Sequence, residues 1–325
     1  MDSDHQKIGL PSVSLRQLHY ALAAADSGNV TEAAKKLHVS QPAISAAIAV
    51  LERHYGTALF TRLPGQGVAP TNFGRSLFAD IRGVLKQVRS VLDLAEASGP
   101  LRGEITIGVY RALAPYYLPA ILQRIAAELP DVAVSFDEAD LDSLVARLHD
   151  GSADLAVTYD VGIDPELSIR RLYALRPFIL VPQDHPLVET GRTHLRDLNG
   201  KPLVLLDQTA SAQYVLGLLH ARNVRPERVI RVQSFELQRS FVANGLGLAL
   251  SHTRPLVATS YDGKELAALP VADRMEPQHV LLAASRRHRA SVASNAVAEI
   301  VVKVFADLPL AAVDDGILIS RKKRA

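Results

Sequence analysis

The hydrophobic pattern of the chain changes its period at about residue 100, and this change constrains the fold more than any other feature. Before it, apolar residues recur every three or four positions, which is typical of amphipathic helices. After it, short apolar runs alternate with helical stretches, which is typical of α/β domains. Ser98-Gly99-Pro100 lies between the two patterns and indicates a hinge. The 325 residues are enough for two or three domains.

Composition excludes several classes of site. The sequence has 0 Cys, which excludes disulfides, thiolate metal sites and cysteine nucleophiles, and fits a cytoplasmic protein. The 11 His are scattered without the spacing of metal ligands, so we expect no metal and no other cofactor. The stretch from Met1 to Pro11 is polar and unlike a signal peptide. No run approaches the ~18 apolar residues of a membrane span, so we expect no membrane partner.

Three helices are predicted close together near the start of the chain. Ser14 can cap the first, whose apolar residues keep helical spacing. Asn29, with a glutamate three residues later, resembles the capping box of a second helix over 30–37. After a short turn, Ser40 caps a third helix over about 41–54, with proline in its first turn.

The turn between the second and third helices is about three residues long, and the third begins Ser-Gln-Pro. This is the pattern of a helix-turn-helix, whose second helix meets DNA bases with its first residues. Those residues would be Gln41, Pro42 and Ser45. A glutamine can hydrogen-bond adenine twice, and a proline can touch a thymine methyl group. The spacing alone fits a plain α-hairpin equally well.

A short hairpin is predicted after the third helix. Its strands flank a Pro-Gly-Gln-Gly tip at 64–67, which suits a β wing beside the helix-turn-helix. Arg62 and Thr71 flank the wing and could grip phosphates. From Val30 to Ser90, eight Lys and Arg stand against three Asp and Glu, an excess of +5. Such an excess attracts DNA, but it also fits an ordinary solvated helix surface.

A long helix is predicted from Thr71 to about Ala97. Its apolar residues recur at alternating steps of four and three, which is the seam of a coiled coil. So much apolar surface must pack on a partner helix, on its own domain, or on both; an ordinary core helix is the alternative. Because a dimer holds two recognition helices one DNA turn apart, we expect dimerisation through Leu77, Ile81, Val84, Val88 and Val91.

These motifs together are similar to a known family. Ala33-Ala34, Leu37, Val39 to Ser45, Leu51-Glu52, Gly56, Leu59 to Arg62, Thr71 and Gly74 resemble the DNA-binding domain of LysR-type transcriptional regulators over about 14–95. The resemblance implies a winged helix-turn-helix over 1–70, a linker helix over 71–98 and a periplasmic-binding-protein-like effector domain over 103–310. It also implies promoter DNA as partner and tetramers built as dimers of dimers, and RNA polymerase is a further expected partner. The expected DNA contacts are Thr31, Ser40, Gln41, Pro42, Ser45, Arg53, Arg62 and Thr71.

One position departs from the family's pattern. The family often has arginine directly after the serine at position 45, whereas this chain has Ala46 followed by Ala47. This difference removes a contact to the groove or to phosphate, so the resemblance does not fix the exact target sequence of this chain.

The second part of the chain is predicted to be a two-lobed α/β domain. Strand, helix, strand, helix, strand is the order from Glu104 to Thr158, which indicates a parallel sheet with helices on both faces. The order repeats in a second half, whose first strand is Leu203 to Leu206. A returning strand near Gln278 to Ala284 and a helix from about Ala290 to Ala306 are expected to complete the first lobe. We expect lobe I over 103–174 and 271–307 and lobe II over 175–270, with a ligand cleft between them. The basic tail, 311–325, is expected to be disordered.

Ligands of α/β sheets bind beyond the carboxyl ends of strands, near helix N-termini. Arg111 could hold a carboxylate there, or could instead pair with Asp137 or Glu138. Thr209 and Ser211 could bind ligand or simply cap a helix. The expected effector contacts are Tyr110, Arg111, Ala112, Tyr159, Asp160, Gln208, Thr209, Ser211, Ser234 and Glu236.

The competing hypothesis is a stand-alone solute-binding protein or an enzyme on the same fold. The sequence has no GxSxG and no HExxH motif, and its two GxG pairs begin no dinucleotide or phosphate-binding motif. A stand-alone binding protein has no use for a helix-turn-helix, a wing and a coiled-coil linker. We therefore predict a DNA-binding regulator without catalytic activity.

Overall fold

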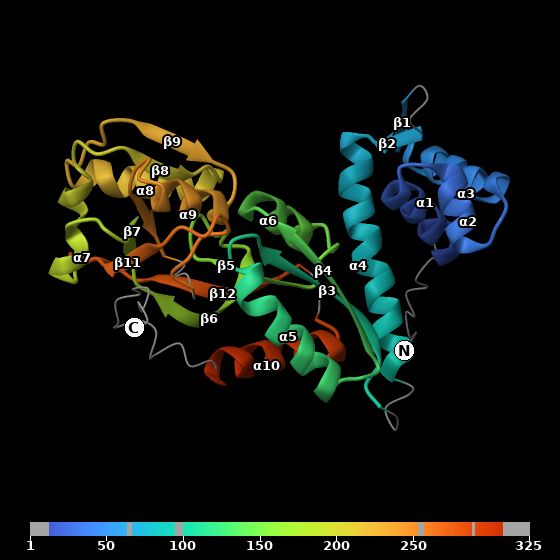
Figure 1. Ribbon diagram of the computed structural model, residues 1–325. Coiled ribbons are helices and arrows are strands. Elements are labelled where there is room, and N and C mark those ends of the chain that lie inside the picture. Colours follow the sequence, from blue (N-terminus) through green and yellow to red (C-terminus); the bar gives the residue numbers. More distant parts are fainter. Residues whose placement is uncertain (1–12, 64–66, 95–99, 253–256, 288–289, 308–325) are drawn as a thin grey trace, which may run out of the picture. The chain divides into compact units, whose positions relative to one another are not determined.

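A computed structural model describes residues 13–63, 67–94, 100–252, 257–287 and 290–307 (Figure 1). The chain forms two compact units. The first extends to Pro100 and the second begins at Leu101, except that the short segment His149–Ser152 is grouped with the first. Each unit has a hydrophobic core of its own. The predicted basic tail and the tip of the wing, 64–66, lie outside the described residues.

The first two helices begin at the predicted caps. α1 (Leu15–Ser27) starts with a capping box, in which Ser14 Oγ accepts the backbone N–H of Gln17 and the Gln17 side chain accepts the backbone N–H of Ser14. α2 (Val30–Leu37) starts at Asn29, whose Oδ1 accepts two backbone N–H groups of the first turn. These bonds satisfy donors that a helix start otherwise leaves without partners.

The third helix follows a tight turn. His38 has a left-handed backbone conformation with φ 53°, which reverses the chain between α2 and α3 (Gln41–Tyr55). Pro42 occupies the first turn, as predicted. Ser40 stands at the capping position, as predicted, but its side chain makes no capping hydrogen bond. The proline has no backbone N–H, so this turn has one donor fewer to satisfy.

The predicted wing is a two-stranded antiparallel hairpin. β1 (Phe60–Leu63) pairs with β2 (Gly67–Pro70). Gly67 lies against the turn between α1 and α2, where a Cβ atom would come within 2.3 Å of the Gly28 carbonyl oxygen. The backbone N–H of Val68 donates to that carbonyl at 2.8 Å. The wing is therefore fixed to the helices, and only glycine fits at its closest approach.

The long helix α4 (Asn72–Leu94) packs on the core of its own unit. Phe78 and Ile81 are each 3% exposed and lie in the core formed by α1, α2 and α3, and Leu77 packs against its edge. The prediction that Ile81 is a dimer contact is therefore wrong, since a side chain this deeply buried cannot reach a partner. Of the alternatives given for the long helix, packing on its own domain is therefore the one that applies to Leu77, Phe78 and Ile81.

Further along α4, apolar side chains do face solvent. Val84 is 42% exposed and Val88 is half-buried. These two stay candidates for a dimer contact. The side chain of Val91 lies outside the described residues.

The first lobe of the second unit is a five-stranded sheet with helices on both faces. Its strands run in the order β4-β3-β5-β12-β6, and in Figure 1 α5 and α10 lie on one face with α6 on the other. The lobe consists of β3 (Gly103–Tyr110), α5 (Ala114–Glu128), β4 (Val132–Ala139), α6 (Leu141–His149), β5 (Leu155–Tyr159), β6 (Leu167–Leu175), β12 (Gln278–Ser285) and α10 (Val292–Asp307).

The strands predicted to be parallel are parallel, and the strand that returns from the second lobe makes the whole sheet mixed. β3 is parallel to both β4 and β5, but β12 returns from the second lobe and is antiparallel to both of its neighbours. The edge strand β6 was not predicted. Its side chains from Ser168 to Arg171 are exposed, so it lacks the apolar run by which a buried strand is recognised.

The second lobe lies between β6 and β12 in the sequence. It has a three-stranded sheet, β10-β7-β11, and a parallel pair, β8-β9, joined by a bridge between Leu203 and Leu248. Its elements are β7 (Phe178–Pro182), α7 (Leu187–Thr190), η1 (Leu195–Leu198), β8 (Leu203–Leu206), α8 (Thr209–Ala221), β9 (Val229–Val232), α9 (Phe235–Ala243), β10 (Ala249–Ser251) and β11 (Leu266–Pro270). Two connections, 176–177 and 271–277, link it to the first lobe. Among the helices described, none has the length and apolar character to cross a membrane.

Candidate functional site

The first turns of α3 present polar side chains to solvent. Gln41, Pro42 and Ser45 are exposed, whereas Ile44 and Ile48 are buried in the core of the first unit. Helical spacing puts the three exposed positions on one face of α3, away from the core. This face begins at a helix N-terminus, whose partial positive charge favours an anion such as phosphate. The side chain of Ala46 is also exposed, so the departure from the family pattern lies on this surface.

Other predicted DNA contacts are accessible too. Four of them have exposed side chains: Thr31 on α2, Ser40 just before α3, Arg53 on α3 and Arg62 on β1. Arg53 is held near its own helix, since its Nε donates to the Ala49 carbonyl at 3.2 Å.

Thr71 has a structural role that excludes the predicted contact. Its hydroxyl donates to the Ala58 carbonyl at 2.9 Å and accepts the backbone N–H of Gly74 at 3.0 Å. Its backbone N–H donates to the Leu59 carbonyl at 2.9 Å. Because a threonine has only these two donors, none is left for phosphate. Thr71 fixes the start of α4 to the wing.

A small cavity lies between the two lobes of the second unit. Its volume is about 50 Å³, and its walls are mostly aromatic and aliphatic. The ring centroids of Tyr110 and Tyr159 lie 5.1 Å apart, and those of Tyr214 and His252 lie 5.5 Å apart. It is lined by Tyr110, Ala112, Tyr159, Leu205, Leu206, Ser211, Tyr214, Val215, Phe235, Gln238, Leu250, Ser251, His252 and Gln278. We call it the aromatic cavity.

A second cavity adjoins the first and is polar. Its volume is about 100 Å³, and it shares Tyr110 and Ser211 with the aromatic cavity. The hydroxyls of these two residues lie 2.8 Å apart and hydrogen-bond across the lobes. The other lining residues are Arg111, Asp140, Leu141, Asp142, Asp207, Gln208, Ala210 and Gln233. We call it the acidic cavity.

Two buried polar atoms at these cavities have no hydrogen-bond partner within the described part of the chain. They are Nε2 of His252, a residue that lines the aromatic cavity, and Oε1 of Gln208, a residue that lines the acidic cavity. The two side chains are 6% and 8% exposed. Burial lowers the pKa of His252 to about 4, against a weaker opposing effect of Asp160, so the imidazole is neutral near pH 7. Burial likewise raises the pKa of Tyr110 and of Tyr214.

Both parts of the chain match models of one family. Residues 15–75 match a bacterial regulatory helix-turn-helix protein of the lysR family, and residues 98–306 match a LysR substrate binding domain. The chain belongs to the LysR family of transcriptional regulators. It is thus a DNA-binding transcriptional regulator modulated by an effector.

Individual LysR relatives cover most of the chain. A hydrogen peroxide-inducible genes activator of Dickeya chrysanthemi is 29% identical over 73% of this chain and 78% of its own length. A putative LysR family regulator from Pseudomonas aeruginosa, a solved structure, is 28% identical with a TM-score of 0.61 and covers 90% of this chain and 99% of its own. The C-terminal domain of a probable LysR family regulator from Rhodococcus sp. RHA1 is 31% identical with a TM-score of 0.59, over 62% of this chain and 99% of its own.

Several predicted effector contacts of this LysR regulator do line the cavities. Tyr110, Ala112, Tyr159 and Ser211 line the aromatic cavity, and Arg111 and Gln208 line the acidic one. Among the described residues, Arg111 forms no ion pair with Asp137 or Glu138, the two alternatives for it, and Asp137 pairs with Arg147 at 2.6 Å instead. The side chain of Thr209, at the start of α8, lies outside the described residues.

Three other predicted effector contacts line neither cavity. Ser234 caps α9 by accepting the Leu237 N–H at 3.2 Å. Glu236 binds Arg239 and the backbone N–H of Tyr261, each at 2.6 Å. Asp160 pairs with His279 at 2.8 Å. These predictions are corrected, since each side chain is engaged with a neighbouring part of the protein.

Some residues of the aromatic cavity were not predicted. Phe235 and Gln238 lie on α9, close to the predicted Ser234 and Glu236, and His252 directly follows β10. The rule that ligands lie beyond strand ends could have found His252. No local signal marks Tyr214 or Gln278, because only the fold brings α8 and the start of β12 to the same space.

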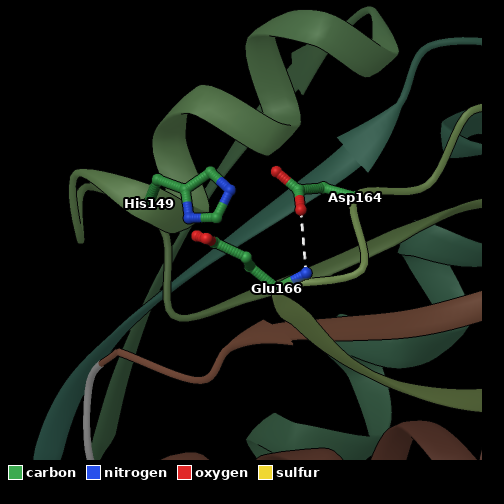
Figure 2. A group of neighbouring side chains, drawn as sticks. All are labelled: His149, Asp164 and Glu166. Atoms are coloured by element: carbon green, nitrogen blue, oxygen red, sulfur yellow. Dashed lines mark hydrogen bonds between the residues drawn. The ribbon is translucent and has the colours of Figure 1, made fainter.

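A group of possible metal ligands lies elsewhere in the described residues. His149, at the end of α6, has a ligand atom within 4.8 Å of carboxylate oxygens of Asp164 and Glu166 (Figure 2). Asp164 accepts the backbone N–H of Glu166 at 2.8 Å, and the Glu166 carboxylate pairs with Arg287. These two carboxylates therefore already have protein partners.

Proposed function

We propose that the chain regulates transcription by reading promoter DNA with the first turns of α3, while a small molecule held between the two lobes changes that binding. The observation that carries the proposal is the division of α3 into an exposed face with Gln41, Pro42 and Ser45 and a buried face with Ile44 and Ile48. The buried face fixes the helix, so the exposed face is presented in one orientation. Such preorganisation is what base readout in the major groove requires.

The input of this regulator is binding of a molecule rather than oxidation of a thiol. One relative is named a hydrogen peroxide-inducible genes activator. Reversible peroxide sensing by cysteine begins at a thiolate, and this chain has 0 Cys. The cavities between the lobes offer a binding site instead, with lining residues from both lobes. A ligand there changes DNA binding to the extent that its affinity differs between two arrangements of the protein.

The assembly and its action follow from the same proposal. We propose that two chains form a dimer through exposed residues of α4 such as Val84, and that two dimers form a tetramer. The tetramer would work in the cytoplasm without catalysis and act on RNA polymerase at the promoter. Two recognition helices held in a dimer would read a site with two half-sites about one DNA turn apart.

The test is selection of binding sites from a library of random duplexes by the full chain. The proposal predicts recovery of one short motif repeated with dyad symmetry, bound with an affinity at least about a thousandfold above that for unselected duplex. Recovery of no motif, with equal affinity for all duplexes, would overturn it.

A further inference from the structure

The chemistry of the two cavities restricts the ligand, given the proposed function. The described residues that line the aromatic cavity include three tyrosines, a phenylalanine and a neutral histidine, and none of them is Asp, Glu, Lys or Arg. An anion placed there would lose its hydration without gaining a counter-charge, and the Asp160 carboxylate lies close enough to act on both Tyr214 and His252. Aromatic walls favour a planar ring, which stacks on or meets the edges of the surrounding rings. This part of the site therefore fits an uncharged ring.

The acidic cavity has the opposite character. It is lined by three aspartates, Asp140, Asp142 and Asp207, and by one arginine, Arg111. Arg231 pairs with Asp207, so three carboxylates face two guanidinium groups. The charge of Arg111 also lies close enough to Asp140 to contribute to the lowered pKa of that carboxyl, after the larger effect of hydrogen bonds from Ser143. A carboxylate ligand would enter surroundings that are already net negative, whereas a protonated amine would be attracted.

An unused acceptor points to the same group. Gln208 lines the acidic cavity, and its Oε1 atom is buried and accepts no hydrogen bond from a described residue. A buried carbonyl without a donor is costly, and a ligand that donates to it removes that cost. An ammonium group has three donors and no acceptor, so it matches both this atom and the carboxylates.

The size of the cavities shows how such a ligand fits. At about 50 and 100 Å³, each is smaller than the ~150 Å³ cavity that accepts benzene in another protein. Tyr110 and Ser211 line both cavities, and the hydrogen bond between their hydroxyls joins the shared walls. Separation of these hydroxyls would merge the two spaces into one that admits a ring with a short side chain.

We propose that the effector is a small aromatic amine without a carboxylate, which places its ring in the aromatic cavity and its ammonium group beside Gln208 in the acidic cavity, and which separates Tyr110 from Ser211. This deepens the proposed function and replaces the carboxylate that Arg111 suggested from the sequence. The His252 Nε2 atom offers one further hydrogen bond to a ring substituent.

Three probes with the same ring but different charge test the ligand class. Benzylamine is a cation, benzamide is neutral and benzoate is an anion at pH 7. Thermal unfolding of the full chain is measured with each at one concentration, because a ligand that binds only the folded state raises Tm more the tighter it binds. We expect the largest rise with benzylamine, a smaller one with benzamide and none with benzoate. A larger rise with benzoate than with benzylamine would overturn the proposal. So would the absence of any rise with benzylamine at about 10 mM, a concentration high enough to reveal millimolar affinity.

A matched pair of variants tests the position of the ammonium group. Gln208→Leu removes the unused acceptor, and Gln183→Leu removes another buried side-chain oxygen without a described partner that lines neither cavity. Both variants should fold, because each replaces an unsatisfied polar atom by an apolar one. Gln208→Leu should weaken benzylamine binding about tenfold or more, while Gln183→Leu leaves it unchanged. Equal affinities in the two variants would contradict the assigned position.

The same samples separate this proposal from the proposed function. Sequence-specific DNA binding by the full chain is measured in parallel on the selected duplex. A chain that binds that duplex but prefers benzoate keeps its regulatory function and loses the amine proposal. A chain that binds benzylamine but shows no preference among duplexes loses the regulatory function and keeps the amine site.

Discussion

The Tyr110 hydroxyl lies 2.8 Å from the Ser211 hydroxyl, and this hydrogen bond connects the end of β3 in one lobe to α8 in the other. Both residues line the two cavities between the lobes, so the bond lies at the proposed ligand site. Burial and this partner together set the chemistry of the phenol: its pKa is raised, with burial as the larger cause, and it remains a neutral hydroxyl.

Tyr110→Phe should therefore have opposite effects on stability and on ligand binding. Loss of the bond should lower the free energy of unfolding by about 1 kcal/mol. If the ligand separates the two hydroxyls, the bond is already broken in the bound state, so its removal should tighten benzylamine binding about fivefold. Chemical denaturation and calorimetric titration measure the two quantities. Tyr261→Phe, at a site 90% exposed, is the control, and weaker benzylamine binding by Tyr110→Phe would argue against separation.

Arg62→Ala should weaken binding to every DNA sequence alike. Arg62 is exposed on β1 of the wing, where it can meet phosphate rather than bases. A lost phosphate contact should lower the slope of log Kd against log salt by about 1. Titrations of selected and unselected duplex at several salt concentrations measure this slope. An effect confined to the selected duplex would instead assign Arg62 to base readout.

Replacement by aspartate should have different effects at Ile81 and at Val84, two positions on α4. Ile81 is 3% exposed in the core, so Ile81→Asp should lower the free energy of unfolding of the first unit by about 3 kcal/mol or more. Val84 is 42% exposed, so Val84→Asp should leave that free energy nearly unchanged but weaken self-association. Denaturation and sedimentation separate the two effects. Wild-type mass for Val84→Asp at all concentrations would exclude Val84 from the dimer contact.

His252 should make the second unit less stable in mild acid. Its pKa is lowered to about 4 from an ordinary value of 6.5, so between these values the unfolded chain binds a proton that the folded chain does not. The free energy of unfolding therefore falls as pH decreases through this window, by about 3 kcal/mol in total. His252→Gln should remove this dependence, while His220→Gln, at an exposed site on α8, should keep it. The same pH dependence in both variants would contradict the role of His252.

Local patterns predicted the elements better than the partners of single side chains. β8 was predicted from its four apolar residues, Leu203 to Leu206, and α1 from its spacing and its cap at Ser14. Edge strand β6 was missed because its exposed residues leave no apolar run.

The site residues were harder because their partners are distant in sequence. Glu236 was expected to face ligand, but it binds the backbone N–H of Tyr261, 25 positions away. The hydroxyl of Thr71 likewise donates to the backbone carbonyl of Ala58, 13 positions earlier in the chain. Exposure of Gln41 and Ser45 followed from helical spacing alone, since the buried residues of α3 are themselves periodic.

The ratio of affinities for the selected duplex and a scrambled duplex tests the role of α3 most directly. It is measured by fluorescence anisotropy for the wild type, for Gln41→Ala and for Gln87→Ala, an exposed glutamine on α4. Gln41→Ala should lose about 1–3 kcal/mol of binding free energy on the selected duplex and nearly nothing on the scrambled one, so the ratio should fall at least about fivefold, while Gln87→Ala keeps the wild-type ratio. An unchanged ratio for Gln41→Ala, or equal losses on both duplexes, would contradict the claim that this face of α3 reads the DNA sequence.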